Sequence, residues 1–100
     1  MSDREFGDTC RLQLSGELDV AVVPEVRAQL VDAAGDIELD CGGLTFIDAS
    51  GVNLFVELDL ACQSRGATLT LLDPPTCVTR LLDLSGLAAI LHVRHEGSVA

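Results

Sequence analysis

The chain has 100 residues, 48% of them hydrophobic, and its 16 acidic residues outnumber its 6 basic residues, so the formal net charge is −10. This length is enough for one compact domain with a single core and too short for two. The negative charge repels phosphate backbones and anionic lipid headgroups, so we expect no nucleic acid and no membrane surface as partners, whereas a protein with a basic contact surface fits.

The first part of the chain predicts a strand, a turn and a helix. Residues 1–9 are polar and are expected to form a short N-terminus ahead of the domain. Apolar and polar side chains alternate over residues 10–15 with the period of two that a half-buried strand requires. Residues 16–19 then turn the chain. Pro24 is favoured at the start of a helix, and this helix is predicted to end at Gly35.

A second strand and a longer helix follow. Residues 37–41 predict a short strand, and Gly42 and Gly43 are expected to interrupt it. Residues 44–47 lead to a helix predicted over residues 51–65.

This longer helix carries two apolar stripes. The broader stripe is expected to face the core and comprises Leu54, Phe55, Leu58, Ala61 and Cys62. The narrower stripe recurs every four residues on another side of the helix, at Val52, Val56 and Leu60. One core layer needs one stripe, so the narrower stripe either packs under a neighbouring element or binds a partner.

The last part of the chain predicts a strand over residues 67–72, a short helix after Pro75 and a final strand over residues 91–95. The first of these strands is apolar enough to be buried on both faces. The residues of the short helix that are expected to face inward are Val78, Leu81, Leu82 and Ser85. Alternating strands and helices predict an α/β fold with a small, mostly parallel sheet of four to five strands flanked by helices. We expect this single domain to span residues 10–96, with a tail over residues 97–100.

Ser50 lies where an apolar run ends and the longer helix begins. Helix N-termini expose unpaired N–H groups and a partial positive charge, which together can hold a phosphate. The Asp48 carboxylate, two residues earlier, repels a phosphate at the same place. Ser50 is therefore a candidate phosphorylation site, and the simpler interpretation is that it is an ordinary N-cap.

No catalytic or metal-binding motif is found in the sequence. The cysteines form no CxxC or Cys/His pair, so we expect reduced thiols and neither a metal nor a cofactor; they are Cys10, Cys41, Cys62 and Cys77. Asp48 and Val52 stand where a G-x-S-x-G nucleophile motif requires glycine, and no phosphate-binding G-x-x-x-x-G-K-[ST] loop is present. We therefore expect that the chain is not an enzyme. No segment has the pattern of a secretory signal or a membrane span, which predicts a cytoplasmic protein.

Three segments form a recognisable set. They are Leu14-Ser15-Gly16-Glu17-Leu18-Asp19, then Leu44-Thr45-Phe46-Ile47-Asp48-Ala49-Ser50-Gly51, and Val78-Thr79-Arg80-Leu81-Leu82-Asp83-Leu84-Ser85-Gly86-Leu87. Together they resemble bacterial anti-sigma factor antagonists of the STAS family, a name that joins sulfate transporters with these antagonists. The order and spacing are those of the family, and the resemblance covers about residues 9–96.

The resemblance implies a partner switch. Such antagonists bind an anti-sigma factor that is also a serine kinase, and this binding frees a sigma factor for transcription. The kinase phosphorylates the serine of the Asp-x-Ser-Gly motif, here Ser50, the phosphorylated form is released, and a serine phosphatase acting on phospho-Ser50 restores binding. The partner-binding residues expected on this basis are Asp19, Asp48, Gly51, Val52, Val56 and Leu60. The chain itself is expected to be a monomer or a weak dimer.

Two alternatives keep the same fold. A STAS scaffold or sensor subunit of a larger stress-signalling assembly would use the same serine, and its mass on size exclusion would distinguish it. A small-ligand-binding module would line a pocket with Glu17, Asp19 and Asp48, but three acidic side chains hold phosphate poorly without a metal.

Overall fold

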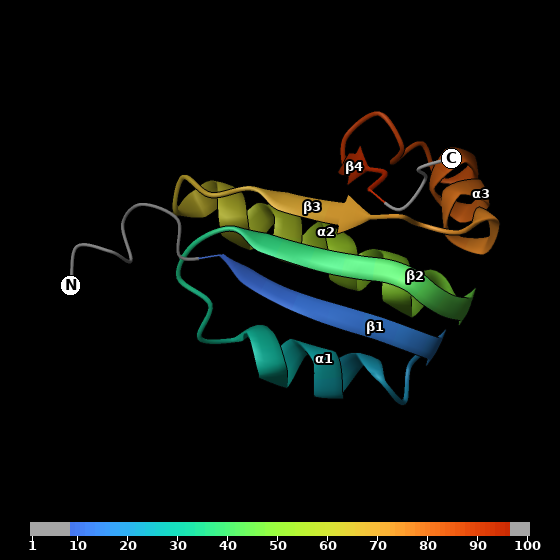
Figure 1. The fold of residues 1–100 in the computed structure, drawn as a ribbon, viewed down its shortest axis with the longest axis horizontal. Coiled ribbons are helices and arrows are strands. Elements are labelled where there is room, and N and C mark those ends of the chain that lie inside the picture. Colours follow the sequence, from blue (N-terminus) through green and yellow to red (C-terminus); the bar gives the residue numbers. More distant parts are fainter. Residues whose placement is uncertain (1–8, 97–100) are drawn as a thin grey trace.

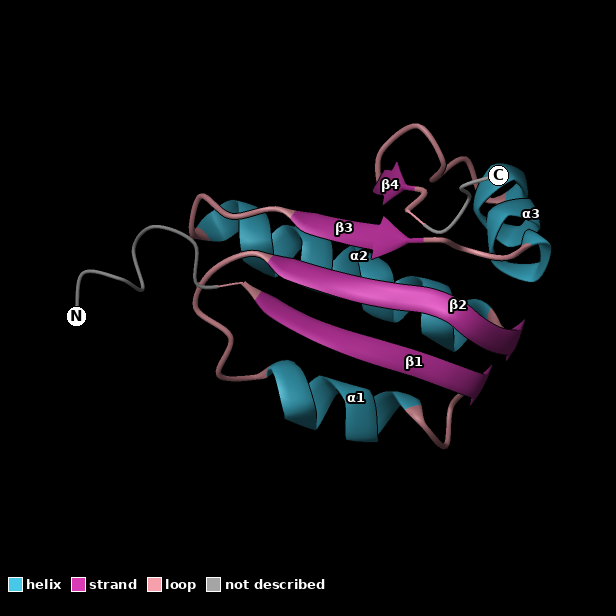
Figure 2. Cartoon of the chain, viewed as in Figure 1, coloured by secondary structure: helices cyan, strands magenta, loops and turns pink. Residues whose placement is uncertain are grey.

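Four parallel strands form one sheet, and a helix follows each of the first three (Figures 1 and 2). The computed structural model describes residues 9–96. In chain order the elements are β1 (Cys10–Leu18), α1 (Val23–Leu30), β2 (Ile37–Ile47), α2 (Ala49–Ser64), β3 (Leu69–Leu72), α3 (Thr76–Leu84) and β4 (His92–Arg94). The sheet order is β1-β2-β3-β4, and each neighbouring pair is parallel, which confirms the predicted fold class. The predicted tail, and the predicted N-terminus apart from Thr9, lie outside the described residues.

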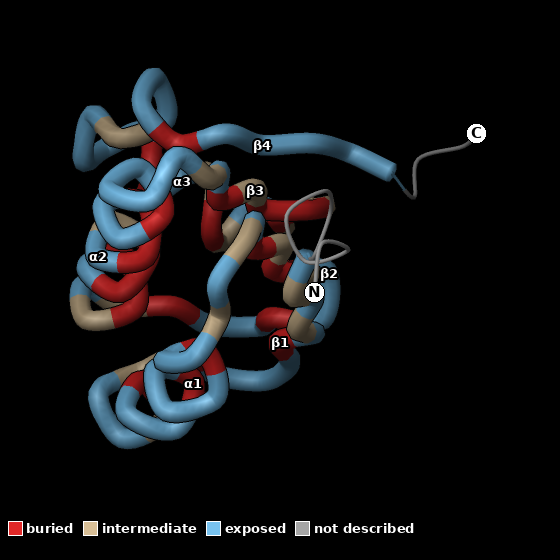
Figure 3. Tube along the Cα trace, turned by 90° about the vertical axis from the view of Figure 1, so that its left-hand side faces the viewer, coloured by how far each residue is buried: buried red, intermediate tan, exposed pale blue. Residues whose placement is uncertain are grey.

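The three helices lie on the same side of the sheet, as Figure 3 shows. The core fills the space between the helices and the sheet, and Leu39, Phe55 and Leu71 within it are 0% exposed. Leu72 is also 0% exposed but lies outside this core cluster, since alternation along β3 turns it away from Leu71. Burial on both faces of β3 was predicted, and it holds for these two leucines.

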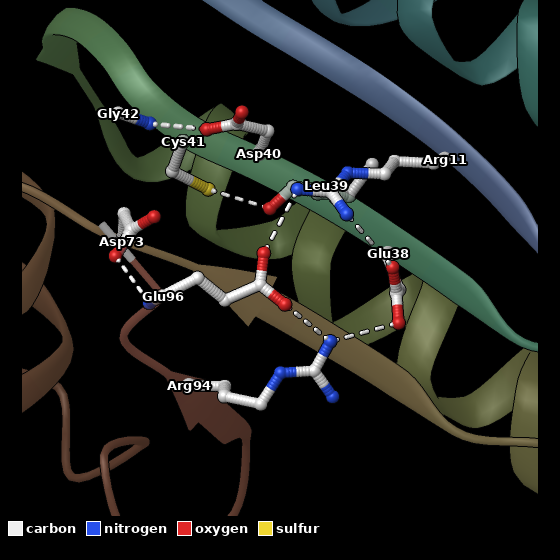
Figure 4. A network of polar contacts seen from close by, with 9 residues as sticks. All are labelled: Arg11, Glu38, Leu39, Asp40, Cys41, Gly42, Asp73, Arg94 and Glu96. Atoms are coloured by element: carbon white, nitrogen blue, oxygen red, sulfur yellow. Dashed lines mark hydrogen bonds and ion pairs between the residues drawn. The ribbon is translucent and has the colours of Figure 1, made fainter. Parts of the chain in front are cut away.

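On the other face of the sheet, four charged side chains form a closed ring of ion pairs (Figure 4). Arg11 of β1 contacts Glu38 of β2 at 3.6 Å and Glu96 at 3.0 Å. Arg94 of β4 contacts the same two carboxylates at 2.9 Å and 3.0 Å. The backbone N–H of Glu96 donates to the Asp73 carboxylate at 2.7 Å. A single exposed ion pair stabilises a fold little, whereas this closed network joins β1, β2, β4 and the segment after β4.

The first two strands are longer than predicted. β1 continues to Leu18, and β2 runs through Gly42 and Gly43 to Ile47. The β1–β2 pairing shifts register at two points, and a Cβ on Gly43 would lie 3.1 Å from the Leu14 carbonyl oxygen. The prediction that the glycines interrupt β2 is therefore wrong, because Gly43 permits a close approach of β1 within the ladder.

The helix boundaries also differ from the prediction. α1 ends at Leu30, before the predicted stop, and α2 begins at Ala49, earlier than predicted. Ala61 and Ser85 were expected to face inward and are exposed. Ser85 is the C-cap of α3, and its hydroxyl donates to the Leu81 carbonyl oxygen at 2.7 Å instead of packing in the core.

Candidate functional site

The candidate site lies at the edge of the sheet where the strands end. Asp48 is the single residue between the end of β2 and the start of α2. Its backbone N–H donates to the carbonyl oxygen of Leu18, the last residue of β1, at 3.4 Å. In parallel α/β sheets, ligand and partner sites gather at the carboxyl ends of the strands. The start of α2, with the predicted phosphorylation site Ser50, is at this edge, on the right of Figure 1.

Asp48, and not Ser50, caps α2. Its backbone is extended, with φ −120° and ψ −171°, and its Oδ1 accepts the backbone N–H of Ser50 at 2.9 Å and of Gly51 at 3.3 Å. The Ser50 hydroxyl donates to the same oxygen at 2.5 Å. The interpretation of Ser50 as the N-cap is therefore wrong, because the carboxylate takes the unpaired N–H groups and Ser50 is the second residue of the helix.

The surroundings of the Ser50 hydroxyl oppose a phosphoryl group at this position. Ser50 is partly exposed, and within residues 9–96 Asp48 has no ion pair with an arginine. A phosphoryl group would replace the proton that Asp48 accepts and bring about two negative charges to the carboxylate. The N–H groups that attract an anion to a helix N-terminus already bind Asp48. Modification of Ser50 would therefore add negative charge beside a carboxylate that has no ion pair with an arginine of residues 9–96.

The hydrogen bonds to Asp48 predict a pH-dependent contribution to stability. The bond from the Ser50 hydroxyl, and then those from the backbone N–H groups of Gly51 and Ser50, lower the pKa of Asp48. A lowered pKa in the folded state means that the ionised cap stabilises the fold above the unfolded-state pKa of about 3.9 and loses this effect as pH falls through the folded-state value. Asp48→Ala should lower the melting temperature by about 5 °C at neutral pH, and by less as the pH falls below 4.

Thermal melts of the wild-type chain and the variant across this pH range check the prediction. Asp32→Ala is the matched control, because Asp32 is exposed in the turn after α1. A difference between wild type and Asp48→Ala that stays constant from neutral to acidic pH would contradict the role of the ionised carboxylate.

Asp19, another predicted contact residue, lies at the same edge. Its Oδ1 accepts the backbone N–H of Ala21 at 3.1 Å and of Val22 at 3.2 Å, and these bonds fold the turn that leads to α1. The last residues of β1 and β2 are partners in the parallel register. Asp19 and Asp48 each follow one of them directly, so the sheet brings these two predicted residues to one edge.

Two predicted contact residues are buried. A Cβ on Gly51 would lie 2.7 Å from Ile47 Cγ1 and 2.9 Å from the Leu18 carbonyl oxygen. Val52 is 4% exposed and belongs to the core cluster. The expectation that Gly51 and Val52 lie on a contact surface is therefore wrong, because the first turn of α2 packs directly against the ends of β1 and β2.

The rest of the narrower stripe approaches the surface along α2. Val56 is half-buried, and Leu60 is 60% exposed. The buried polar residue between them is Asp59, which is 5% exposed and accepts a hydrogen bond from Gln63 Nε2 at 2.7 Å. Val56 and Leu60 remain available to a partner on the helix that begins at the candidate site.

A groove beside the site is formed by residues that were not predicted as functional. We name it the β2–α3 groove; it has a volume of about 310 Å³ and is lined by Phe46, Ile47, Cys77, Arg80, Leu81 and Leu84. Phe46 is 47% exposed and Leu84 is 79% exposed. Side chains alternate between the two faces of a strand, so Phe46 and Ile47 lie on opposite faces. This alternation is the sequence signal that could have identified Phe46 as exposed.

The described residues were compared with the requirements of a metal site and of a membrane span. Within residues 9–96, no group of three or more His, Cys, Asp or Glu residues is placed to hold a metal ion, and no helix is long and apolar enough to cross a bilayer. The four cysteines are free thiols. Burial raises the pKa of the Cys41 thiol to about 12, so this thiol is protonated and unreactive at neutral pH.

Comparison with known proteins identifies the family. The family model described as "Mlab, STAS domain" matches residues 1–92. The chain belongs to the STAS domain family. This STAS domain is 30% identical over 95 residues to an anti-sigma-B factor antagonist of Staphylococcus epidermidis, covering 91% of this chain and 87% of that protein. It is 31% identical over 91 residues to the Staphylococcus aureus anti-sigma-B factor antagonist, covering 87% of this chain and 83% of that protein.

Solved structures share the fold of this STAS domain. A Thermotoga maritima protein, solved as a candidate anti-sigma factor antagonist, matches with a TM-score of 0.83 at 22% identity, over 91% of this chain and 82% of that one. The anti-sigma factor antagonist SpoIIAA in its unphosphorylated form matches with a TM-score of 0.76 at 25% identity, over 89% and 82%. SpoIIAA of Bacillus in the phosphorylated form matches with a TM-score of 0.70 at 25% identity, over 87% and 82%.

Proposed function

We propose that this STAS domain is an anti-sigma factor antagonist that works by partner switching in the cytoplasm. In its unphosphorylated form it binds an anti-sigma factor that is also a serine kinase, and it is released when that kinase phosphorylates Ser50. A serine phosphatase acting on phospho-Ser50 returns it to the binding form. In this cycle the STAS domain is the substrate of two enzymes and catalyses no reaction itself.

The observation that carries the proposal is the hydrogen bond between the Ser50 hydroxyl and the Asp48 carboxylate at the partly exposed start of α2. A neutral hydroxyl in this position can be covered by a partner at small cost, since its proton already has an acceptor. No arginine of residues 9–96 is ion-paired with Asp48, and a phosphoryl dianion beside this carboxylate would lose its hydration on docking. The two forms of Ser50 should therefore differ strongly in affinity for the same partner.

The two SpoIIAA structures support a switch that keeps the fold. One is unphosphorylated and the other phosphorylated, and both align with this STAS domain over 87% or more of its residues. A change of local charge can control docking on its own, and no rearrangement of the sheet is required.

The proposed contact surface is centred on the start of α2. Asp19 and Asp48 lie at its strand end, and Val56 and Leu60 continue it along the helix. The acidic residues suit a basic partner surface, and exposed apolar side chains at the centre of an interface supply most of its affinity. Gly51 and Val52 support this surface from below and are not proposed as contacts.

Phosphate transfer tests the proposal directly. The tagged chain is used to isolate its anti-sigma factor from cells that express both, and the purified pair is incubated with ATP. We expect one phosphoryl group, located on Ser50 by fragmentation mass spectrometry, and loss of the complex on size exclusion. Ser50→Ala should take up no phosphate and stay in the complex, because it lacks the acceptor oxygen.

Ser64→Ala is the matched control, since Ser64 is an exposed serine at the other end of the same helix and should leave phosphorylation unchanged. Phosphate on another residue, or a phosphorylated chain that stays bound, would overturn the proposed function.

A further inference from the structure

The β2–α3 groove combines apolar walls with a single charged residue. Five of its six lining residues are Phe46, Ile47, Cys77, Leu81 and Leu84, and the sixth is Arg80. Two of these apolar side chains are exposed, Phe46 by about half and Leu84 by most of its surface. Exposed apolar surface around a groove is typical of a place that another molecule covers.

Arg80 differs from the other arginines of residues 9–96. Those arginines have partners: Arg11 and Arg94 in the ring of ion pairs, Arg27 with Glu57 at 2.8 Å, and Arg65 with the Gly35 carbonyl oxygen at 2.9 Å. Arg80 is exposed and makes no hydrogen bond or ion pair within the described part of the chain. On a chain with a net charge of −10, an exposed arginine that is unpaired within residues 9–96 can bind a carboxylate of another molecule through its planar guanidinium.

The groove is continuous with the proposed contact surface. Its β2 wall consists of Phe46 and Ile47, which directly precede Asp48, the residue that binds the Ser50 hydroxyl. A protein that covers Ser50 is therefore next to the groove. The negative charge on most of the STAS domain surface favours basic groups on a partner. The groove instead favours an apolar side chain next to an acidic one.

We infer that the β2–α3 groove receives an apolar side chain of the anti-sigma factor, with a neighbouring carboxylate of the same protein paired to Arg80. This inference rests on the proposed function and adds the chemistry of the partner segment that docks beside Ser50. The apolar side chain supplies burial, and the Arg80–carboxylate pair fixes the orientation of the segment.

Binding measurements on the purified anti-sigma factor test the inference. Arg80→Gln and Leu84→Ser should each weaken binding about tenfold. Arg80→Gln removes the cation, and Leu84→Ser removes the exposed apolar side chain that lines the groove. Gln29→Glu is the control for net charge, since it also changes the charge by −1, on an exposed residue near the end of α1. Val31→Ser is the control for exposed apolar surface, since Val31 is 73% exposed and lies outside the groove. Both controls should bind within about twofold of the wild-type chain.

A charge reversal gives a second measurement. Arg80→Glu should be rescued by changing one acidic residue of the anti-sigma factor to arginine, and circular dichroism confirms that each variant is folded.

If Arg80→Gln and Leu84→Ser bind like the wild type while Ser50→Asp does not, the groove is no part of the interface and the proposed function stands. Equal losses with Arg80→Gln and Gln29→Glu would assign the effect to overall charge and also overturn the inference. If Ser50→Asp binds normally, the proposed function itself is contradicted.

Discussion

Ser50→Asp is expected to lower the affinity of this STAS domain for its anti-sigma factor about a hundredfold, which corresponds to about 2.7 kcal/mol. The substitution removes the hydroxyl proton that Asp48 accepts and places a second carboxylate beside the first. Both charges would have to lose water on docking, and no arginine pairs with Asp48 in residues 9–96. Isothermal titration calorimetry with the unphosphorylated chain measures the difference.

Ser50→Asn is the matched control for this prediction, because asparagine has the size of aspartate and no charge. It should retain most of the affinity, since its side-chain amide can donate to Asp48 as the hydroxyl does. If the asparagine variant loses as much affinity as the aspartate variant, the effect is steric and the argument from charge fails.

The second large effect is expected on stability, at Gly51. Gly51→Ala should lower the free energy of unfolding by about 2 kcal/mol, even though alanine favours a helix over glycine by about 1 kcal/mol. The added Cβ would lie 2.7 Å from Ile47 Cγ1 and 2.9 Å from a backbone oxygen, that of Leu18. The start of α2 must move away from the ends of β1 and β2 to make room. Urea denaturation followed by circular dichroism measures the loss.

Gly42→Ala is the control for Gly51→Ala. A Cβ on Gly42 would meet the Asp40 side-chain oxygen Oδ1 at 3.3 Å, and this side chain can give way. The control should therefore change stability by less than about 0.5 kcal/mol. Equal stability of wild type and Gly51→Ala would show that the close packing of α2 is not required.

The order of strands and helices was predictable because each element has its own periodicity. Apolar side chains alternate along β1, and Pro24 is the second residue of α1, so both elements begin within one residue of where the pattern indicated. The continuity of β2 was not predictable, since it depends on how closely β1 approaches Gly43, and that contact joins residues far apart in the chain.

The sequence predicted that a helix begins next to Ser50, but not which residue caps it. Asp48 and Ser50 are both good capping residues, and only the extended backbone of Asp48 decides which of them caps α2. The residues of the narrower stripe do not share one environment, and the reason is geometric. A spacing of four residues turns about 40° further than a full helical turn at each step, so Val52 faces the core whereas Leu60 reaches solvent.

The β2–α3 groove could not be predicted from any one segment. Phe46 and Arg80 come from a strand and a helix that the fold brings together, and only the structure shows that Arg80 has no partner among the described residues. A charged residue on the outer face of a short helix has the same sequence pattern whether it binds a partner or is solvated.

The close packing of α2 against the sheet has a consequence for phosphorylation of Ser50. Because Gly51 fixes the first helical turn against the ends of two strands, the turn has little freedom to swing aside and relieve an added negative charge. Phosphorylation would then leave the fold unchanged, and removal of the phosphate would be enough to restore the binding form. One molecule would therefore pass through many rounds of binding and release without refolding.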